Sequence, residues 1–313
     1  MDRIFKNILV PIDGSSASKT SQEMAIFFSK LFDSEATLLH VVSHELMTPG
    51  TLAFSQEGES YRKEYTPVSM STGQFPRAVR LPQTRENKYP SEVVTEVTQW
   101  YFEKGEEIAS NAVALFKKEG TPTEKKLLEG TDPSEFILAE AEKHDLIIMG
   151  NSGSEENEQD LHLGSNARKV SAAAKIPVLI VREKKQVSKI LVPIDGTAKE
   201  EKALKYASII AKIMKAKTTL MHVQETRLLK IRPEIETFGK QILENAANKI
   251  EAAAEQKLVS GDPAKAIIQA AKQGDTDLII ITNGGPKSLK HFLLGSVTDH
   301  VLNHATVPVL VVR

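Results

Sequence analysis

Two glycine-rich segments contain the residues of this chain best suited to bind an anion. One runs from Ile281 to Val297 as ITNGGPKSLKHFLLGSV, and the other from Gly150 to Ser165 as GNSGSEENEQDLHLGS. Glycine lets a backbone approach a ligand closely. Ser296 and Ser165 are candidate N-caps of the helices that follow, and a helix N-terminus offers unpaired N–H groups and a positive dipole end. The pattern therefore indicates anion binding.

These segments belong to an internal repeat. ILVPIDG starts at Ile8 and again at Ile190, an offset of 190 − 8 = 182. Further matches follow in the same order, namely His40-Val41 with His222-Val223, Gly130 with Gly261, Asp145 with Asp277, Gly164-Ser165 with Gly295-Ser296, and closing strands ending at Arg182 and Arg313. Ordered matches of this kind indicate a duplicated domain.

The repeat predicts two domains, residues 1–183 and 187–313, joined by the charged linker EKKQV. His40 and Gly130 are 130 − 40 = 90 positions apart, but His222 and Gly261 only 261 − 222 = 39, so the first copy has 90 − 39 = 51 extra residues. This insertion, about residues 44–90, is rich in polar residues and proline and has no sustained apolar period. We expect a long loop there.

Each copy alternates short apolar runs with segments of helical periodicity. In the first copy, strands are expected at residues 8–12, 37–42, 126–128, 146–149 and 178–181, and helices at 18–32, 91–118, 133–143 and 165–174. Continuous Ile/Leu/Val strands between helices predict a parallel sheet covered on both faces. The fold class is therefore α/β, with two tandem doubly wound, Rossmann-like domains. Pairing of the last strands, 178–181 with 309–312, would remove two open edges and form an intramolecular pseudo-dimer.

Composition excludes several classes of function. The formal charge of −1 does not favour nucleic acid or an anionic membrane as a partner, and the absence of Cys excludes thiolate metal sites and thiol catalysis. No apolar run approaches about eighteen residues, and MDRIFKN lacks the apolar core of a signal peptide, so a cytoplasmic protein is expected. The sequence has no GxxxxGK[ST] loop, no GxGxxG after either first strand and no G-x-S-x-G. We therefore expect no enzyme.

In doubly wound sheets a ligand lies beyond the carboxyl ends of the strands, where the strand order reverses. Candidate ligand contacts are therefore residues at strand ends and in the glycine-rich segments. In the second copy these are Pro193, Ile194, Asp195, Val223, Ile281, Thr282, Gly285, Gly295, Ser296 and Val297.

At these residues the chain resembles the universal stress protein family, over nearly its whole length, as a tandem pair. Nucleotide-binding members carry G-x2-G-x9-G-[ST] after the fourth strand, an Asp at the end of the first strand and a Val after the second. The resemblance implies an adenine nucleotide alpha hydrolase-like fold, a site for ATP or AMP with or without Mg²⁺, and a homodimer. We expect any ATP hydrolysis to be slow and incidental. In the first copy it marks Pro11, Asp13, Val41, Gly150, Gly153, Gly164 and Ser165.

Both copies depart from the family's loop. In the second, Thr282 replaces the first glycine, although the spacing to Gly285 and Gly295 is kept. In the first, ten residues separate Gly153 from Gly164, and the loop contains Glu155, Glu156, Glu158 and Asp160. Four carboxylates oppose a triphosphate. We therefore expect the second copy to bind nucleotide in preference to the first.

Structural roles compete with these functional ones. Asp13 and Asp195 suit ordinary Asp-Gly turns, His40 and His222 suit hydrogen-bonded structural positions, and the i, i+4 pair His300 and His304 lacks the acidic partner of an HExxH metal site. Two functions stay open: a nucleotide-responsive stress protein, and an interaction module that uses the insertion of the first copy to dock unknown protein partners without nucleotide.

Overall fold

The computed structural model describes residues 4–43, 91–152, 162–183, 186–224, 235–251, 253–284 and 294–313. The expected long loop of the insertion lies outside the described residues, as do Gly153, Gly285 and the four carboxylates of the acidic loop.

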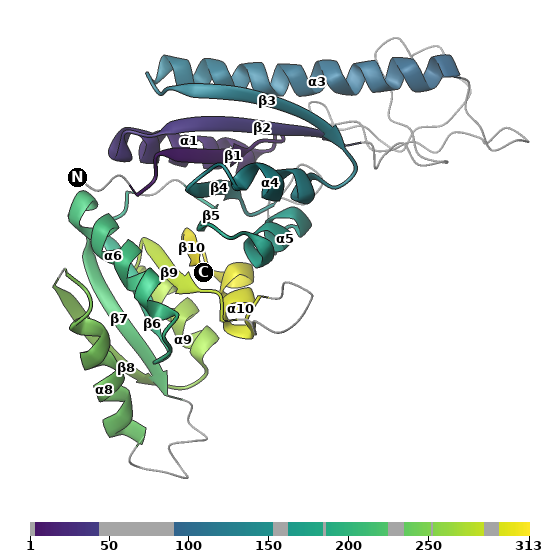
Figure 1. The fold of residues 1–313 in the computed structure, drawn as a ribbon. Coiled ribbons are helices and arrows are strands. Elements are labelled where there is room, and N and C mark those ends of the chain that lie inside the picture. Colours follow the sequence, from purple (N-terminus) through teal and green to yellow (C-terminus); the bar gives the residue numbers. More distant parts are fainter. Residues whose placement is uncertain are drawn as a thin grey trace, which may run out of the picture.

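The first domain alternates strands and helices as expected (Figure 1). Its elements are β1 (Asn7–Pro11), α1 (Ser16–Phe32), β2 (Glu35–Ser43), α3 (Ser91–Lys118), β3 (Thr123–Gly130), α4 (Pro133–Ala141), β4 (Leu146–Gly150), α5 (Ser165–Ala173) and β5 (Val178–Val181).

The second domain repeats this order. Its elements are β6 (Lys189–Ile194), α6 (Glu200–Met214), β7 (Lys217–Gln224), α8 (Ile235–Ala247), β8 (Ala254–Ser260), α9 (Pro263–Ala270), the π-helical turn η3 (Ala271–Asp275), β9 (Leu278–Thr282), α10 (Ser296–His304) and β10 (Val309–Val312).

The expected bounds of α3 and β5 are confirmed, and several others shift. β3 is longer than expected because it pairs with β2 from Thr123 to Gly130. α4 ends at Ala141, two residues early, and α1 begins at Ser16, two residues before the expected start. The charged linker ends in a buried apolar residue, since Val187 is 3% exposed and belongs to the core.

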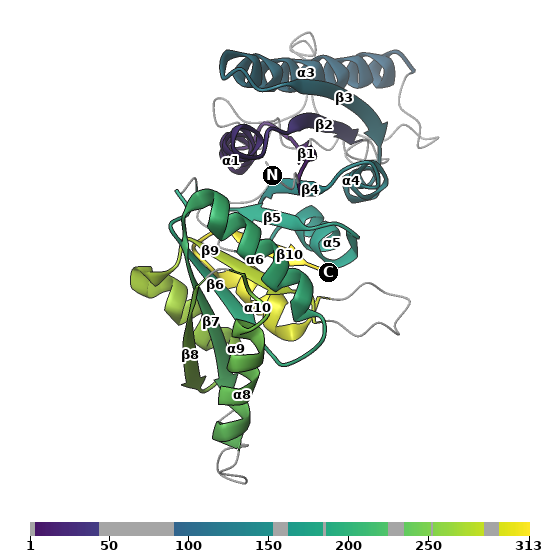
Figure 2. The same cartoon turned by 60° about the vertical axis from the view of Figure 1, so that its left-hand side comes forward.

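The ten strands of the described residues form one sheet, in the order β3-β2-β1-β4-β5-β10-β9-β6-β7-β8. Pairing is parallel inside each domain, and β5 meets β10 antiparallel, with Leu179 opposite Leu310. Figure 2 shows the first domain above the second, with these two strands between them. The expected pairing of the last strands, and hence the intramolecular pseudo-dimer, is confirmed.

One apolar core lies on each face of this shared sheet. α1, α3, α6 and α8 cover one face, where Phe28 and Leu204 pack against alternate strand residues. α4, α5, α9 and α10 cover the other, where Val170 and Val301 are fully buried. Both cores contain residues from both domains. The sheet is thus wound on both sides, as the uninterrupted apolar strands predict.

Reciprocal arginine contacts strengthen the domain junction. Arg182, which follows β5, donates to the carbonyl of Leu302 in α10, and Arg313, which follows β10, donates to the carbonyls of Ala172 and Ala173 at the end of α5. A cation at a helix C-terminus complements the negative end of the helix dipole. Burial lowers the pKa of Arg182 to about 10, so it still carries its charge at neutral pH.

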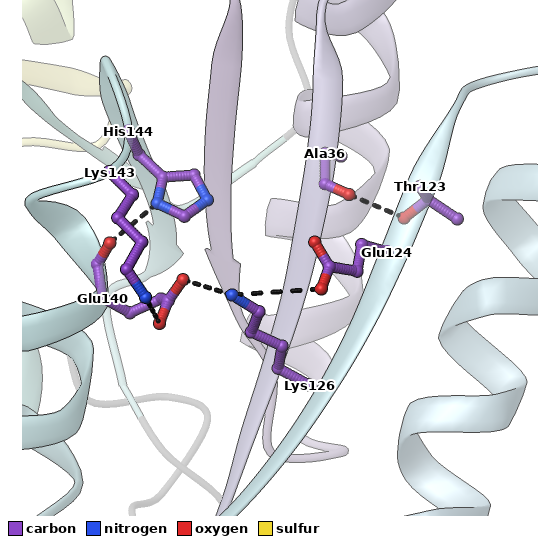
Figure 3. A network of polar contacts seen from close by, with 7 residues as sticks. All are labelled: Ala36, Thr123, Glu124, Lys126, Glu140, Lys143 and His144. Atoms are coloured by element: carbon purple, nitrogen blue, oxygen red, sulfur yellow. Dashed lines mark hydrogen bonds and ion pairs between the residues drawn. The ribbon is translucent and has the colours of Figure 1, made fainter.

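The outer strand β3 is anchored to α4 by charged side chains. Lys126 of β3 forms an ion pair with Glu140 of α4, Lys143 donates to the same carboxylate at 3.3 Å, and the His144 ring donates to the Glu140 carbonyl at 2.8 Å (Figure 3). Burial opposes the charge of Glu140, yet the two lysines keep its pKa below the usual glutamate value. Charged side chains on an outer strand also discourage pairing with other chains.

Candidate functional site

The candidate ligand residues gather at the carboxyl ends of neighbouring strands. β6 lies between β9 and β7, and β1 lies between β4 and β2, so the strand order reverses at β6 and at β1. In the second domain Pro193 and Ile194 end β6, Val223 lies near the end of β7, Ile281 and Thr282 end β9, and Gly295, Ser296 and Val297 begin α10. In the first, Pro11 ends β1, Val41 lies in β2, Gly150 ends β4, and Gly164 and Ser165 begin α5.

In the first domain, serine side chains organise the loop after β1. Asp13 Oδ1 accepts from the backbone N–H of Ser15 at 2.9 Å and from its hydroxyl at 2.6 Å. The Ser15 hydroxyl also caps α1 by accepting from Ser18 N–H at 3.0 Å. Ser18 Oγ in turn accepts from the backbone N–H of Asp13 at 3.2 Å. The carboxylate is therefore the acceptor of a closed turn, as the structural interpretation of Asp-Gly predicts.

In the second domain a carboxylate replaces the serine. Adding the offset of 182 to Ser18 gives Glu200, and its Oε1 accepts from the backbone N–H groups of both Asp195 and Gly196. Asp195 Oδ1 accepts from Thr197 N–H at 2.9 Å, which repeats the contact of Asp13 with Ser15. The side chain of Asp195 thus keeps its place in the turn, while the acceptor beneath the loop changes from a hydroxyl to a carboxyl group.

The two carboxyl groups of this loop differ in their protonation. Burial, and then the neighbouring Asp195, raise the pKa of Glu200 to about 7. Burial also opposes the charge of Asp195, but hydrogen bonds from Thr197 and Glu200 and the nearby Lys199 hold its pKa below the usual aspartate value. Two neighbouring carboxyl groups do not both ionise easily, and here Glu200 is the one that takes up the proton.

The two histidines near the ends of β2 and β7, His40 and His222, have the structural role that the sequence predicts for them. The Nδ1 atom of His40 donates to the Ile12 carbonyl at 2.8 Å, and that of His222 donates to the Ile194 carbonyl at 2.7 Å. Burial lowers the pKa of His40, against the opposing effects of the Ile12 contact and of Asp13. Each ring therefore holds the end of one strand against its neighbour, one residue before the aspartate.

The prediction that Ser165 and Ser296 are N-caps is wrong. Gly164 and Gly295 are the N-caps of α5 and α10, and Ser165 and Ser296 are the first helical residues. By contrast, α1, α4 and α9 are capped by the side chains of Ser15, Asp132 and Asp262. Glycine offers no side-chain acceptor, so the first-turn N–H groups of α5 and α10 receive no bond from a cap side chain. Such N–H groups suit an anionic ligand.

Asparagine residues hold the entry to both helices, in two different ways. Gly164 N–H donates to the backbone carbonyl of Asn151 at 2.7 Å, whereas Gly295 N–H donates to the side-chain oxygen of Asn283 at 3.1 Å. Both asparagines continue from the strand end, since their own N–H groups bond to Val181 and Val312. Neither asparagine was among the sequence candidates, although both directly follow the observed strands β4 and β9.

The two domains also differ where the first glycine of the family pattern stands. A Cβ atom on Gly150 would lie 2.8 Å from the backbone of Ala17, in the first turn of α1. Gly150 is therefore required by the close approach of that turn. In the second domain Thr282 has this place, and α6 begins at Glu200, whose counterpart Ser18 is already two residues inside α1. A later helix start is consistent with the larger side chain.

The start of α5 contacts α10 across the domain junction. Asn303 Oδ1 of α10 accepts from Leu163 N–H at 3.1 Å and from Arg168 of α5 at 3.3 Å, and Arg168 forms an ion pair with Asp299 at 3.1 Å.

Within the described ranges no group of three or more acidic, histidine or cysteine residues is arranged to hold a metal ion. None of the described helices combines the length and the apolar character needed to cross a membrane.

A model of the universal stress protein family matches residues 4–99, 81–182 and 186–313, which together include nearly the whole chain. The chain belongs to the universal stress protein family. Universal stress protein YxiE of Bacillus subtilis is 34% identical over 146 residues, which cover 40% of this chain and 99% of that protein. A universal stress protein of Methanocaldococcus jannaschii is 30% identical over 186 residues, or 59% of this chain and 86% of that protein.

Solved structures confirm the tandem arrangement of this universal stress protein. The crystal structure of a universal stress protein from Archaeoglobus fulgidus aligns with 100% of this chain and 99% of its own, with a TM-score of 0.67 and 20% identity. A universal stress protein structure from Pseudomonas aeruginosa aligns with 99% of this chain, with a TM-score of 0.65 and 16% identity. At these identities the likeness concerns the fold alone.

The most informative residue that the sequence analysis missed is Glu200. The signal was present, because the offset of 182 aligns IDGSSAS with IDGTAKE and places a carboxylate opposite Ser18. The sequence alone does not say that this side chain is 7% exposed or that it turns back toward the loop after β6. A charged residue in the first helical turn normally suggests a solvated position that favours the helix dipole.

Proposed function

We propose that this universal stress protein binds an adenine nucleotide, ATP or AMP, at the carboxyl ends of β6, β7 and β9 in the second domain. The observation that supports it most is the glycine-capped N-terminus of α10, which lies at the point where the strand order reverses and has no capping side chain. The nucleotide's phosphates would lie at these N–H groups, with Asp195 at the neighbouring strand end.

The second domain is favoured over the first by charge. The sequence between Gly153 and Gly164 contains four carboxylates, whereas the segment between Gly285 and Gly295 contains Lys287, Lys290 and His291 and no carboxylate. Positive side chains attract a phosphate group and carboxylates repel it. If Mg²⁺ accompanies ATP, it would be bound chiefly through the phosphates, since that ion usually keeps several waters and few protein ligands.

The proposal is for a binding protein and not for an enzyme. Hydrolysis of ATP needs a positioned water and a group that stabilises the transferred charge, and neither is identified among the described residues. Nucleotide occupancy would instead signal stress conditions to partner proteins. A cytoplasmic location and association into a homodimer are further parts of this proposal and rest on the family alone.

Ligand release and calorimetry test the proposal together. Freshly purified protein is denatured, released nucleotides are identified by mass spectrometry, and stripped protein is titrated with ATP, ADP and AMP with and without Mg²⁺. We expect about one site per chain. Two sites would contradict the preference for the second domain, and no binding at all would favour the nucleotide-independent interaction module.

A matched pair of variants locates the site. Gly295 has φ −62° and Gly164 has φ −59°, angles that any L-residue adopts, so Val at either place adds a side chain without backbone strain. We expect Gly295→Val to weaken nucleotide binding at least about tenfold, because its side chain would stand where the phosphates approach. Gly164→Val should bind like the wild type. The reverse result would move the site to the first domain.

A further inference from the structure

The first residue of α6, Glu200, has a buried carboxyl group that bonds to the loop after β6, which carries the proposed ligand contact Asp195. Glu200 is 7% exposed, and its Oε1 accepts from two consecutive backbone N–H groups, those of Asp195 and Gly196. Gly196 has φ +83°, a left-handed conformation that glycine adopts without strain, and this lets the chain turn directly after Asp195. The side chain of Glu200 therefore sets the charge directly beneath the loop that carries Asp195.

The first domain shows what the same fold does without this charge. Ser18 stands in the equivalent place, is 4% exposed, and accepts from Asp13 N–H with a neutral hydroxyl. The turn around Asp13 forms with serine hydroxyls, those of Ser15 and Ser18, and with no second carboxyl group. The carboxyl group of Glu200 is therefore not needed to build the turn, and it introduces a second acid beside Asp195 in the domain proposed to bind an anion.

Few other charged or titratable groups face this pair among the described residues. Asp195 comes from the loop after β6 and is hydrogen-bonded to Glu200, and Lys199 precedes Glu200 at the start of α6. From the neighbouring strand β7, His222 lies opposite Ile194, the residue before Asp195. From α8, the nearest side chain to Gly196 is the apolar Ile242. Asp195 and His222 are the titratable neighbours whose protonation a test has to separate from that of Glu200.

We infer that Glu200 is a proton-dependent regulator of the second domain's site, which binds an anionic nucleotide more tightly when Glu200 is protonated than when it is ionised. This inference rests on the proposed function. When Glu200 is ionised, two carboxylates stand side by side at the ligand edge, and both repel phosphate. When Glu200 is protonated, one negative charge is removed while the backbone N–H groups keep an oxygen acceptor.

The pH range follows from the same surroundings. Because the pKa of Glu200 is raised to about 7, the change of charge falls near neutral pH, whereas an exposed glutamate would already be ionised. By linkage, a bound anion favours the protonated form, so binding at neutral pH takes up a fraction of a proton. Nucleotide affinity should therefore rise as the pH falls through neutrality.

The test measures nucleotide affinity at pH 6 and at pH 8 for the wild type and for Glu200→Gln, which keeps the acceptor oxygen and the size of the side chain. Phosphate itself titrates near pH 6 and would change the affinity of both proteins. For each protein we therefore divide the dissociation constant at pH 8 by that at pH 6, and then divide the wild-type ratio by the ratio of the variant. We expect this quotient to be about 3 to 10, the effect of one nearby negative charge, that of ionised Glu200, on the nucleotide's phosphates. Glu200→Ser, which reproduces Ser18, is a second variant with the same expectation.

Three further measurements make the outcome specific. Adenosine has no phosphate charge, so its affinity should give a quotient near one. His222→Asn keeps a donor for the Ile194 carbonyl and removes the imidazole, and it should retain the wild-type pH ratio. Calorimetry in two buffers of different ionisation enthalpy should show proton uptake at pH 7 that is smaller in Glu200→Gln.

Failure of this inference differs from failure of the proposed function. If wild type and Glu200→Gln bind nucleotide with equal pH ratios, or if the ratio disappears in His222→Asn, the regulator role of Glu200 is wrong and the nucleotide site remains. If neither protein binds ATP, ADP or AMP at either pH, the proposed function is wrong and the inference falls with it.

Discussion

The two domains are alike where they meet and differ where a ligand would bind. At the junction, β5 and β10 are both four-residue apolar strands, and each is followed by an arginine that bonds to the last helix of the other domain. At the carboxyl ends of the strands the same aspartate turn lies above Ser18 in one domain and above Glu200 in the other. The junction needs two matching halves, because each strand is the other's partner. The carboxyl ends of the strands, where a ligand would bind, are not paired between the domains, so they can differ.

This difference teaches where a duplicated chain is free to change. A substitution in β5 alters the packing of both domains, since both cores continue through the shared sheet. A substitution in the loop after β6 alters one site only. Two such exchanges are Glu200 for Ser18, beneath the loop after β6, and Thr282 for Gly150, at the end of β9.

The largest effect is expected at the domain junction, where the two domains are alike, when the leucines at the centre of β5 and β10 are truncated. Leu179 and Leu310 are each 1% exposed and lie opposite each other. We expect Leu179→Ala and Leu310→Ala each to lower the free energy of unfolding by about 3 kcal/mol, through lost burial and the cavity left behind. Urea unfolding followed by circular dichroism measures both. A difference between the two variants larger than about 1.5 kcal/mol would contradict the equivalence of the two strands.

The next test concerns the strand ends where a ligand would bind, where the two domains differ, and exchanges the residues at the ends of β4 and β9. Gly150→Thr forces a side chain against the Ala17 backbone, and we expect a loss of about 2 kcal/mol. Thr282→Gly, the opposite exchange, should cost less than about 1 kcal/mol, the usual penalty of glycine in a strand. Equal losses in urea unfolding would show that the close approach of α1 to β4 is not what requires glycine.

A third test concerns stability against pH. The folded pKa of Glu200 is about 7, above its ordinary value of 4.5, so its stabilising contribution is present below pH 4.5 and is lost as the pH rises through 7. Glu200→Gln should therefore raise the melting temperature relative to the wild type more at pH 8 than at pH 5.

The mirror variant serves as the control for that test. Ser18→Glu should introduce a similar loss of stability at high pH into the first domain, because Ser18 is also buried beneath its loop. A melting temperature of Glu200→Gln that follows the wild type at both pH values would mean that the carboxyl group is not held in its protonated form by the fold.

The smallest expected effect is at the ion pair between the helix entries. Arg168 and Asp299 are partly exposed, with 49% and 33% of their side chains accessible. Their coupling in a double-mutant cycle, with each replaced by Ala, should be below about 1 kcal/mol and should decrease with added salt. A larger, salt-independent coupling would indicate that this contact is a main determinant of domain pairing.

Most of the architecture follows from local patterns in the sequence. The repeated ILVPIDG, the uninterrupted apolar strands and the helical periodicity of residues 91–118 predict the two doubly wound domains. The pairing of the last strands could also be predicted, because two short apolar edges are unfavourable when left open. Strand bounds were less predictable, since β3 owes its full length to its partner β2 and not to its own polar residues.

The ligand edge was only partly predictable. Asp13, Asp195 and the Gly-Ser pairs could be placed at the strand ends because the parallel fold brings those ends together. The cap residues were mistaken because Ser is a common N-cap, whereas Gly164 and Gly295 have the extended backbone angles of the cap position and their N–H groups bond to Asn151 and Asn283.

By itself, the sequence determined the duplication, the fold class, the family and the strand ends of each domain where a ligand would bind, since these depend on residue order and on apolar periodicity. Only the tertiary structure decided which groups meet at those strand ends. Glu200 becomes an acid with a pKa near 7 because the fold buries it beside Asp195, and Gly150 becomes indispensable because α1 comes close to it. Burial and proximity arise between distant segments, so no local pattern contains them.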